Sequence, residues 1–181
     1  MGARRNTILG LATIIAFVAT GMLANAGAQE GDPVKGSAEI DYPGFAAMSD
    51  EVMAYRESRL VSLVDFNEMK DQPDTIILDT RSQFAFEAGH VDGAVHLNFS
   101  DFTDEKLADV IPTKDTRILI YCNNNFEDDI EPVMLKRAPL ALNIPTFINL
   151  YGYGYENVYE LGEMVSTSDA DVNWVSSLQT P

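Results

Sequence analysis

The stretch that decides the fold is Ile118-Leu119-Ile120-Tyr121-Cys122, which the polar run Asn123-Asn124-Asn125 follows at once. A short, β-rich run bounded by turn-forming residues predicts a buried strand. Cys122 is the single cysteine of the 181-residue sequence and stands directly after that strand. Reactive groups in open α/β sheets gather just beyond the carboxyl ends of strands, so the position predicts an accessible, nucleophilic thiol. A buried structural thiol is the alternative, because free cysteine is among the most buried residue types.

Strand and helix patterns alternate on both sides of this stretch. The predicted strands cover residues 75–78, 94–97, 117–121 and 158–161. The predicted helices cover residues 49–59, 64–70, 104–110 and 145–151, with a short helical turn at 84–87. Alternation of this kind is typical of a parallel sheet covered by helices on both faces. The sequence therefore predicts an α/β fold.

Three segments carry a more specific pattern. The first is Leu78-Asp79-Thr80-Arg81 with Phe86, Gly89-His90-Val91 and Gly93-Ala94; the second is the strand that ends at Cys122; the third is Gly154-Tyr155-Glu156-Asn157-Val158-Tyr159-Glu160-Leu161. In order and spacing they resemble the rhodanese-like sulfurtransferase family, with its D-x-R … F-x-x-G-H-[IV]-x-G-A signature and its G-[FY]-x-N-V-x-x-L ending. The resemblance covers roughly residues 60–162. It implies a rhodanese-like open parallel sheet, flanked by helices on both faces, with Cys122 as the nucleophile.

The resemblance also implies covalent chemistry. In this family the cysteine accepts a sulfane sulfur and becomes a persulfide, from which a thiol or cyanide removes the sulfur. The loop after the cysteine directs its backbone amides, and a following helix N-terminus, at the sulfur. We therefore expect the persulfide to be held by the four residues after the nucleophile, Asn123, Asn124, Asn125 and Phe126. Arg81 is expected to face a bound anion, unless it pairs with Asp79 or Glu87 instead.

The loop after Cys122 departs from the family in charge and in length. Active members usually carry a cation about five residues after the cysteine, where this sequence has Glu127 within Glu127-Asp128-Asp129. Carboxylates beside the sulfur predict a raised thiol pKa and poor use of thiosulfate, which is a dianion. The stretch from Cys122 to Gly154 is also longer than usual. We expect the added residues to fold as a lid, whose cations Lys136 and Arg137 either return positive charge to the site or face water.

The N-terminal residues have the three parts of an export signal. Arg4-Arg5 is a positive region, residues 8–23 are apolar, and a small-residue cleavage site follows at Ala24-Asn25-Ala26 or Ala26-Gly27-Ala28. We assign residues 1–28 to a signal peptide, 29–56 to a leader with an extra helix, 57–165 to the rhodanese-like domain and 166–181 to a loosely held polar tail. The protein is therefore expected in the periplasm or elsewhere in the cell envelope, with an uncleaved N-terminal anchor as the alternative.

Charge limits the partners. Cleavage of the signal removes two of the 12 basic residues and none of the 28 acidic ones, which leaves a net charge of −18. Such a surface repels nucleic acid and anionic lipid, so neither nucleic acid nor, after signal cleavage, a membrane is expected as a partner. His90 and His96 stand in no ligand spacing with each other or with Cys122, so no metal and no cofactor is predicted.

These observations predict an exported sulfurtransferase. It would pass sulfane sulfur from a small-molecule or protein-bound donor, through a Cys122 persulfide, to a thiol acceptor. Two alternatives stay open. One is a binding module that has lost the chemistry and uses residues 127–129 to contact a basic protein partner. The other is a redox sensor, in which Cys122 is oxidised and then reduced by thiols of the cell envelope.

Overall fold

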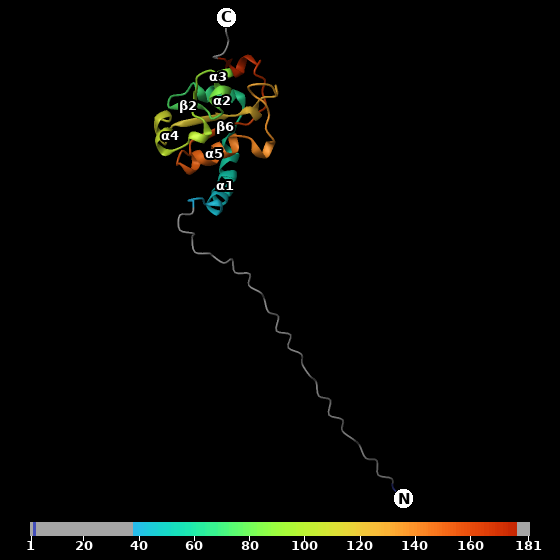
Figure 1. Cartoon of the computed structure of the whole chain (residues 1–181). Helices are drawn as coiled ribbons and strands as arrows, with labels where there is room; N and C mark the ends of the chain where they lie inside the picture. The colour runs from blue at the N-terminus through green and yellow to red at the C-terminus, as the bar shows by residue number, and fades with distance from the viewer. Residues whose placement is uncertain (1, 3–37, 177–181) are drawn as a thin grey trace. The chain divides into compact units, whose positions relative to one another are not determined.

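Five parallel strands form the centre of the protein (Figure 1). The computed structural model describes residues 2 and 38–176. The order of the strands is β1-β6-β5-β2-β4, and every neighbouring pair is parallel. Their bounds are β1 (Leu60–Val61), β2 (Thr75–Asp79), β4 (Ala94–His96), β5 (Arg117–Tyr121) and β6 (Val158–Leu161). β5, which leads into Cys122, therefore lies between β6 and β2 in the middle of the sheet.

Helices cover both faces of this sheet. They are α1 (Tyr42–Arg56), α2 (Leu63–Lys70), α3 (Gln83–Ala88), α4 (Asp104–Val110) and α5 (Asn143–Gly152). Side chains of α1, α4 and α5 pack with Ile118 and Ile120 on one face, and α2 packs with Leu119 and Tyr121 on the other. Alternate residues of a strand point to opposite faces, and all four of these are buried, which explains why β5 is apolar throughout. The predicted α/β fold is confirmed.

Shorter elements connect these. They are the 3₁₀ turns η1 (Glu57–Arg59), η2 (Phe99–Asp101), η3 (Asn123–Asn125), η4 (Ala138–Leu140) and η5 (Ala170–Val172), and the two-residue strands β3 (His90–Val91) and β7 (Trp174–Val175).

The first helix begins earlier than its pattern predicted. α1 starts at Tyr42 rather than Ser49, because the Asp41 carboxylate accepts a hydrogen bond from Gly44 N at 2.9 Å and Pro43 lies in the first turn. The helix contacts α5 and buries Val52 in the core. The helix and the sheet belong to one compact unit, and this unit begins at Ile40.

The C-terminal segment is held far more firmly than the sequence predicted. β7 pairs antiparallel with β3, Val172 is buried, and the Trp174 ring packs edge-on against Phe126 at 4.9 Å between centroids. Gly89 makes room for this ring, since a Cβ there would lie 2.4 Å from Trp174 Nε1. The prediction of a loose tail is therefore wrong for residues 170–175, because Val172 and the Trp174 ring pack against the core.

The predicted signal peptide and its alternative, an anchor, fall on residues 1–28, of which the structure describes only Gly2. Within residues 38–176 no helix is both long and apolar enough to span a bilayer.

Candidate active site

Cys122 lies at the carboxyl edge of the sheet, where the parallel strands place their functional groups. It follows β5 directly, between the ends of β6 and β2. The residue is only 1% exposed, so the prediction of an openly accessible thiol is wrong. It does, however, line a cavity of about 250 Å³ together with Asn124, Asn143 and Glu160. Cys122 thus borders a hollow although it is buried, and we call this hollow the Cys122 cavity.

Backbone N–H groups from two elements point at the sulfur. They belong to Asn143 and Leu142 at the start of α5 and to Asn124 in η3. Burial raises the pKa of the Cys122 thiol most strongly and the Glu160 carboxylate raises it further, whereas these three hydrogen bonds lower it; the net shift is upward. The net balance of these groups therefore favours the neutral thiol over the thiolate. The amides stabilise whatever negative charge develops on sulfur during a reaction.

The asparagine run builds the turn more than it contacts the sulfur. Asn123 Nδ2 donates to Met134 O at 2.9 Å, and the Asn124 side chain donates to Lys136 O and accepts from Lys136 N. Asn125 Oδ1 accepts from Cys122 N at 2.9 Å. These side chains fix the turn after Cys122 and tie the long segment that follows to it, which is how that segment covers the site.

The backbone of the turn corrects part of the predicted persulfide cradle. Asn125 N bonds to Cys122 O and Phe126 N to Asn123 O, so both amides are engaged within the turn itself. Phe126 is buried in the core below. Of the four predicted residues, Asn124 directs its amide at the sulfur, and Asn125 N also faces the Cys122 side chain in a capping-box arrangement. The start of α5 supplies the other amides. The sequence predicted this helix at residues 145–151, but the position of the helix beside Cys122 depends on the fold.

Arg81 is locked in a buried ion pair. Its Nη2 lies 2.6 Å from Asp79 Oδ2 and 2.6 Å from Gly89 O, and its side chain is 3% exposed. Asp79 also accepts from Tyr121 Oη at 2.6 Å. The guanidinium is therefore engaged by Asp79, one of the two partners that the sequence left open, and among the described residues Arg81 is not one that lines the Cys122 cavity.

The two histidines serve backbone groups. His90 Nδ1 lies 2.7 Å from Phe86 O, and His96 Nε2 lies 2.8 Å from Arg81 O. Each ring closes a turn of the D-x-R … G-H signature, which explains their place in the pattern without a metal ion.

Comparison with known proteins agrees with this geometry. The model of the rhodanese-like domain matches residues 62–162. The chain belongs to the rhodanese-like domain family. Curated relatives are tRNA uridine(34) hydroxylases: that of Cytophaga hutchinsonii is 25% identical over 59% of this chain and 30% of its own, and that of Salmonella newport is 31% identical over 46% and 23%. The chain thus spans less than a third of the length of these relatives.

A solved structure resembles the chain more distantly. The crystal structure of the BH2092 protein from Bacillus halodurans is 15% identical, with a TM-score of 0.44 over 64% of this chain and 74% of its own.

The acidic run that replaces the expected cation of the rhodanese-like loop turns away from the sulfur. Glu127 is exposed and its N bonds to Val165 O, Asp128 accepts from Thr167 N at 2.9 Å, and Asp129 accepts from Leu135 N at 2.8 Å. Among the described residues, those that line the Cys122 cavity do not include these three. The carboxylate that raises the thiol pKa is Glu160, so the prediction named the wrong residues.

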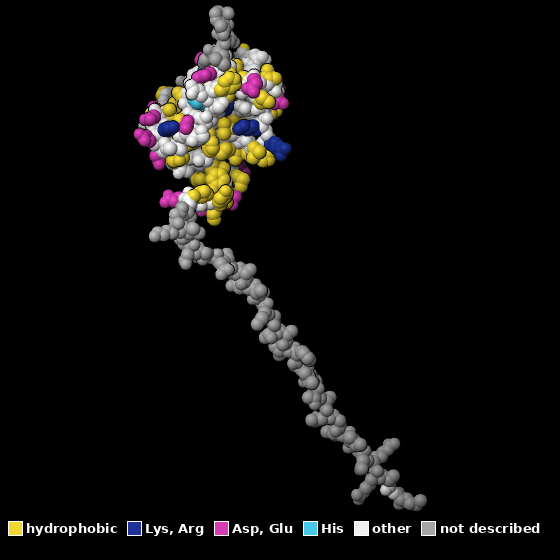
Figure 2. Space-filling model, viewed as in Figure 1, with side chains coloured by type: hydrophobic (Ala, Val, Ile, Leu, Met, Phe, Trp, Pro, Cys, Tyr) yellow, Lys and Arg dark blue, Asp and Glu magenta, His cyan; other side chains and the backbone are white. Residues whose placement is uncertain are grey.

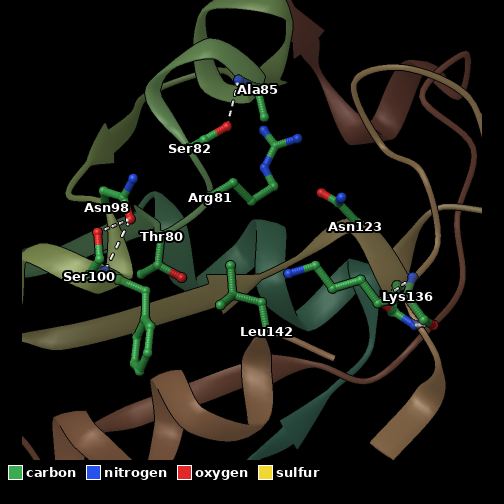
Figure 3. Close-up of a pocket in the computed structure, with 11 residues that line it drawn as sticks. Thr80, Arg81, Ser82, Ala85, Asn98, Ser100, Asn123, Lys136 and Leu142 are labelled. Carbon is green, nitrogen blue, oxygen red and sulfur yellow. Dashed lines mark hydrogen bonds between the residues drawn. The ribbon is translucent and has the colours of Figure 1, made fainter. Parts of the chain in front are cut away.

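The two predicted lid cations are placed differently. Lys136 lines a second cavity of about 280 Å³, which shares Asn124 with the Cys122 cavity but lies on the side of Thr80 and Ser82. Figure 3 shows the Lys136 ammonium extending into this second cavity, which Arg81 and Ala85 also line, with the Arg81 guanidinium turned toward Ala85. Arg137 is exposed at the start of η4 and lines neither cavity. The longer segment after Cys122 therefore places one cation, Lys136, in the cavity next to the Cys122 cavity and not at the sulfur.

Sequence reasoning missed an ion pair inside the Cys122 cavity. Glu160 of β6 is buried, its Oε1 lies 2.8 Å from Arg56 Nη2, and its Oε2 bonds to Arg56 Nε. Arg56 comes from α1, which precedes the rhodanese-like segment. The signal for this pair was a glutamate within a strand whose other residues are apolar or aromatic, since a carboxylate that such a strand buries requires a partner.

Proposed function

We propose that the protein transfers sulfane sulfur through a persulfide on Cys122. The observation that carries this proposal is the position of Cys122: the residue lines a cavity, and its sulfur faces three backbone N–H groups from η3 and the N-terminus of α5. Such donors favour a sulfur anion over a neutral thiol without placing a formal charge in the site. Membership of the rhodanese-like family supports the same chemistry.

The reaction consists of two displacements. Cys122 gives up its proton and attacks the outer sulfur of a donor R–S–SH; the Sγ–S bond forms, the donor S–S bond breaks, and R–S⁻ leaves and takes a proton. An acceptor thiolate then attacks the outer sulfur of Cys122, which forms the acceptor persulfide and returns the Cys122 thiolate. In both steps negative charge develops on sulfur beside the amides of Asn124, Leu142 and Asn143.

The proposal extends to location and partners. The signal-like residues 1–28 support export to the cell envelope, where a small-molecule or protein-bound persulfide would be the donor and a thiol the acceptor. Figure 2 shows Asp and Glu side chains scattered over the visible face, with Lys and Arg in a few small groups. This charge disfavours nucleic acid, so we do not extend the tRNA named for the longer relatives to this chain. In this proposal Lys136 is the lid cation, and Arg81 and Arg137 bind no substrate.

Intact mass spectrometry tests the proposal. After incubation with a persulfide donor, the native protein should gain one sulfur atom and lose it again to a thiol acceptor, whereas Cys122→Ser should gain none. A Cys122 that gains oxygen but no sulfur would favour the redox sensor. A Cys122 that reacts only after unfolding would favour the binding module.

A further inference from the structure

A continuous row of hydrogen bonds links α1 to the nucleophile. Arg56 Nη2 donates to Glu160 Oε1 at 2.8 Å, and Asn143 Nδ2 donates to the same oxygen at 3.2 Å. Asn143 Nδ2 also lies 3.1 Å from Asn125 Oδ1, which accepts from Cys122 N at 2.9 Å. The row thus begins on a helix that precedes the matched segment and ends on the backbone of Cys122.

The orientation of each amide in this row is fixed by its neighbours. Asn125 Oδ1 must be an acceptor, because Cys122 N can only donate, and Asn125 Nδ2 donates on its other side to Leu161 O at 2.7 Å. The Asn143 group that faces this oxygen is therefore its NH₂, which also suits the Glu160 carboxylate. Asn143 is in turn one of the three residues whose backbone N–H groups point at the Cys122 sulfur. Hydrogen bonds to the Asn143 side chain therefore also fix the backbone N–H group that faces the sulfur.

The charge of Arg56 gives this row of hydrogen bonds a second effect, which is electrostatic. The charged side chains that line the Cys122 cavity are Arg56 from α1, Glu160 from β6 and Glu163 just after it. Of these, Glu163 is exposed and accepts from Leu63 N, whereas Glu160 is buried. The α5 and η3 residues around the sulfur are uncharged. Without Arg56, the buried Glu160 carboxylate would face the sulfur uncompensated and oppose the formation of a thiolate.

We propose that Arg56 is a positioning residue for Cys122, so that α1 is part of the active site rather than a leader. It neutralises Glu160 and, through that carboxylate, aligns Asn143 at the sulfur. The position of the loop cation of active rhodanese-like proteins is taken here by Glu127, and Arg56 restores positive charge from a different element. This inference rests on the proposed function for its meaning, but the state of the thiol can be measured without sulfur transfer.

The test is the rate at which iodoacetamide alkylates Cys122 in the native, full-length protein, measured against pH. Arg56→Gln should move the profile to higher pH and lower the rate at neutral pH by about tenfold. Arg56→Lys should recover part of the rate, because it keeps the charge and loses the bidentate geometry. Arg56→Gln combined with Glu160→Gln should move the profile back to or below that of the wild type, because no uncompensated carboxylate is left.

Arg59→Gln is the matched control. Arg59 follows α1 closely and bonds to Tyr55 Oη at 2.7 Å, but it lies outside the cavity lining. It should alter stability without moving the alkylation profile. Equal profiles for Arg56→Gln and wild type would overturn the inference, as would a native Cys122 that iodoacetamide does not reach. If the profiles move as expected and Cys122 still gains no sulfur, the positioning role stands and the proposed function fails.

Discussion

Two arginine–carboxylate pairs flank the end of β5, one on each side of the nucleophile. On the β2 side, Asp79 and Arg81 are two residues apart, and their side chains are 0% and 3% exposed. On the β6 side, Glu160 and Arg56 are 104 residues apart, and their side chains are 9% and 37% exposed. The first pair is closed over by Tyr121, Gly89 and Trp174, whereas the second lines the cavity that contains Cys122.

The two ion pairs therefore differ in their roles: one contributes to stability and the other to the reactivity of Cys122. A sealed ion pair has little value to a reaction, but breaking it leaves a charge that the interior cannot solvate. An ion pair at a cavity wall is partly solvated and costs less to break, yet its field acts on the neighbouring thiol. Removal of the β2 pair should therefore lower stability, and removal of the β6 pair should change reactivity.

The largest expected effect is on the sealed pair. Asp79→Asn keeps the shape of the side chain but leaves the Arg81 guanidinium buried without its counter-charge, and we expect a loss of about 3–5 kcal/mol of unfolding free energy. Chemical denaturation monitored by the single tryptophan, Trp174, measures it. Asp101→Asn is the control, because its pair with Lys106 is half exposed and should contribute at most about 1 kcal/mol. Similar losses for the two variants would remove the distinction between sealed and exposed pairs.

A smaller loss of stability is expected at Trp174, which covers the Asp79–Arg81 pair. The Trp174 ring lies 5.4 Å from the Arg81 guanidinium carbon and packs on Phe126. Trp174→Ala should undock β7 and cost about 2 kcal/mol, less than the 3–5 kcal/mol of a fully buried tryptophan. Thermal unfolding followed by circular dichroism measures the change. Val175→Ala, at the exposed neighbour, should be close to wild type; an equal loss there would mean that strand pairing, rather than the indole, holds the tail.

The third prediction concerns the choice of sulfur donor and sharpens the role of the cavity pair. Glu160→Gln leaves Arg56 unpaired at the cavity, so sulfur loading from thiosulfate should rise about fivefold more than loading from 2-hydroxyethyl persulfide, a donor with no charged group on its carbon chain. Glu127→Gln is the control, because Glu127 lies outside the cavity lining and should leave this ratio unchanged. If Glu127→Gln changed this ratio more than Glu160→Gln, residues 127–129 rather than Glu160 would control the choice of donor.

The sequence predicted what depends on local pattern and on family order. The bounds of β5, α4 and β6 agree with the structure, because short apolar runs with clear turn or cap residues on either side define them. The D-x-R pattern also offered Asp79 as a partner for Arg81, and the structure has this pair. Residues that are two positions apart in the sequence stay close in any fold.

What the sequence could not predict depends on contacts between distant residues. Nothing in the spacing of Arg56 and Glu160 shows that α1 crosses to the end of β6. The run 127–129 was placed beside the sulfur because it is adjacent in sequence, but the Phe126–Val165 bridge directs the chain away after only four residues. The docking of Trp174 likewise depends on the space left at Gly89, on a different part of the chain.

Sulfur transfer through Cys122 is tested by following one sulfur atom. The native protein is loaded from a donor whose outer sulfur is isotopically labelled, separated from the donor, and mixed with an acceptor thiol, and both products are analysed by mass spectrometry. The label is expected first on Cys122 and then on the acceptor in equal amount, with no transfer by Cys122→Ser. Label that reaches the acceptor equally well with Cys122→Ser, or that stays on Cys122 in the presence of the thiol, would rule out transfer through a Cys122 persulfide.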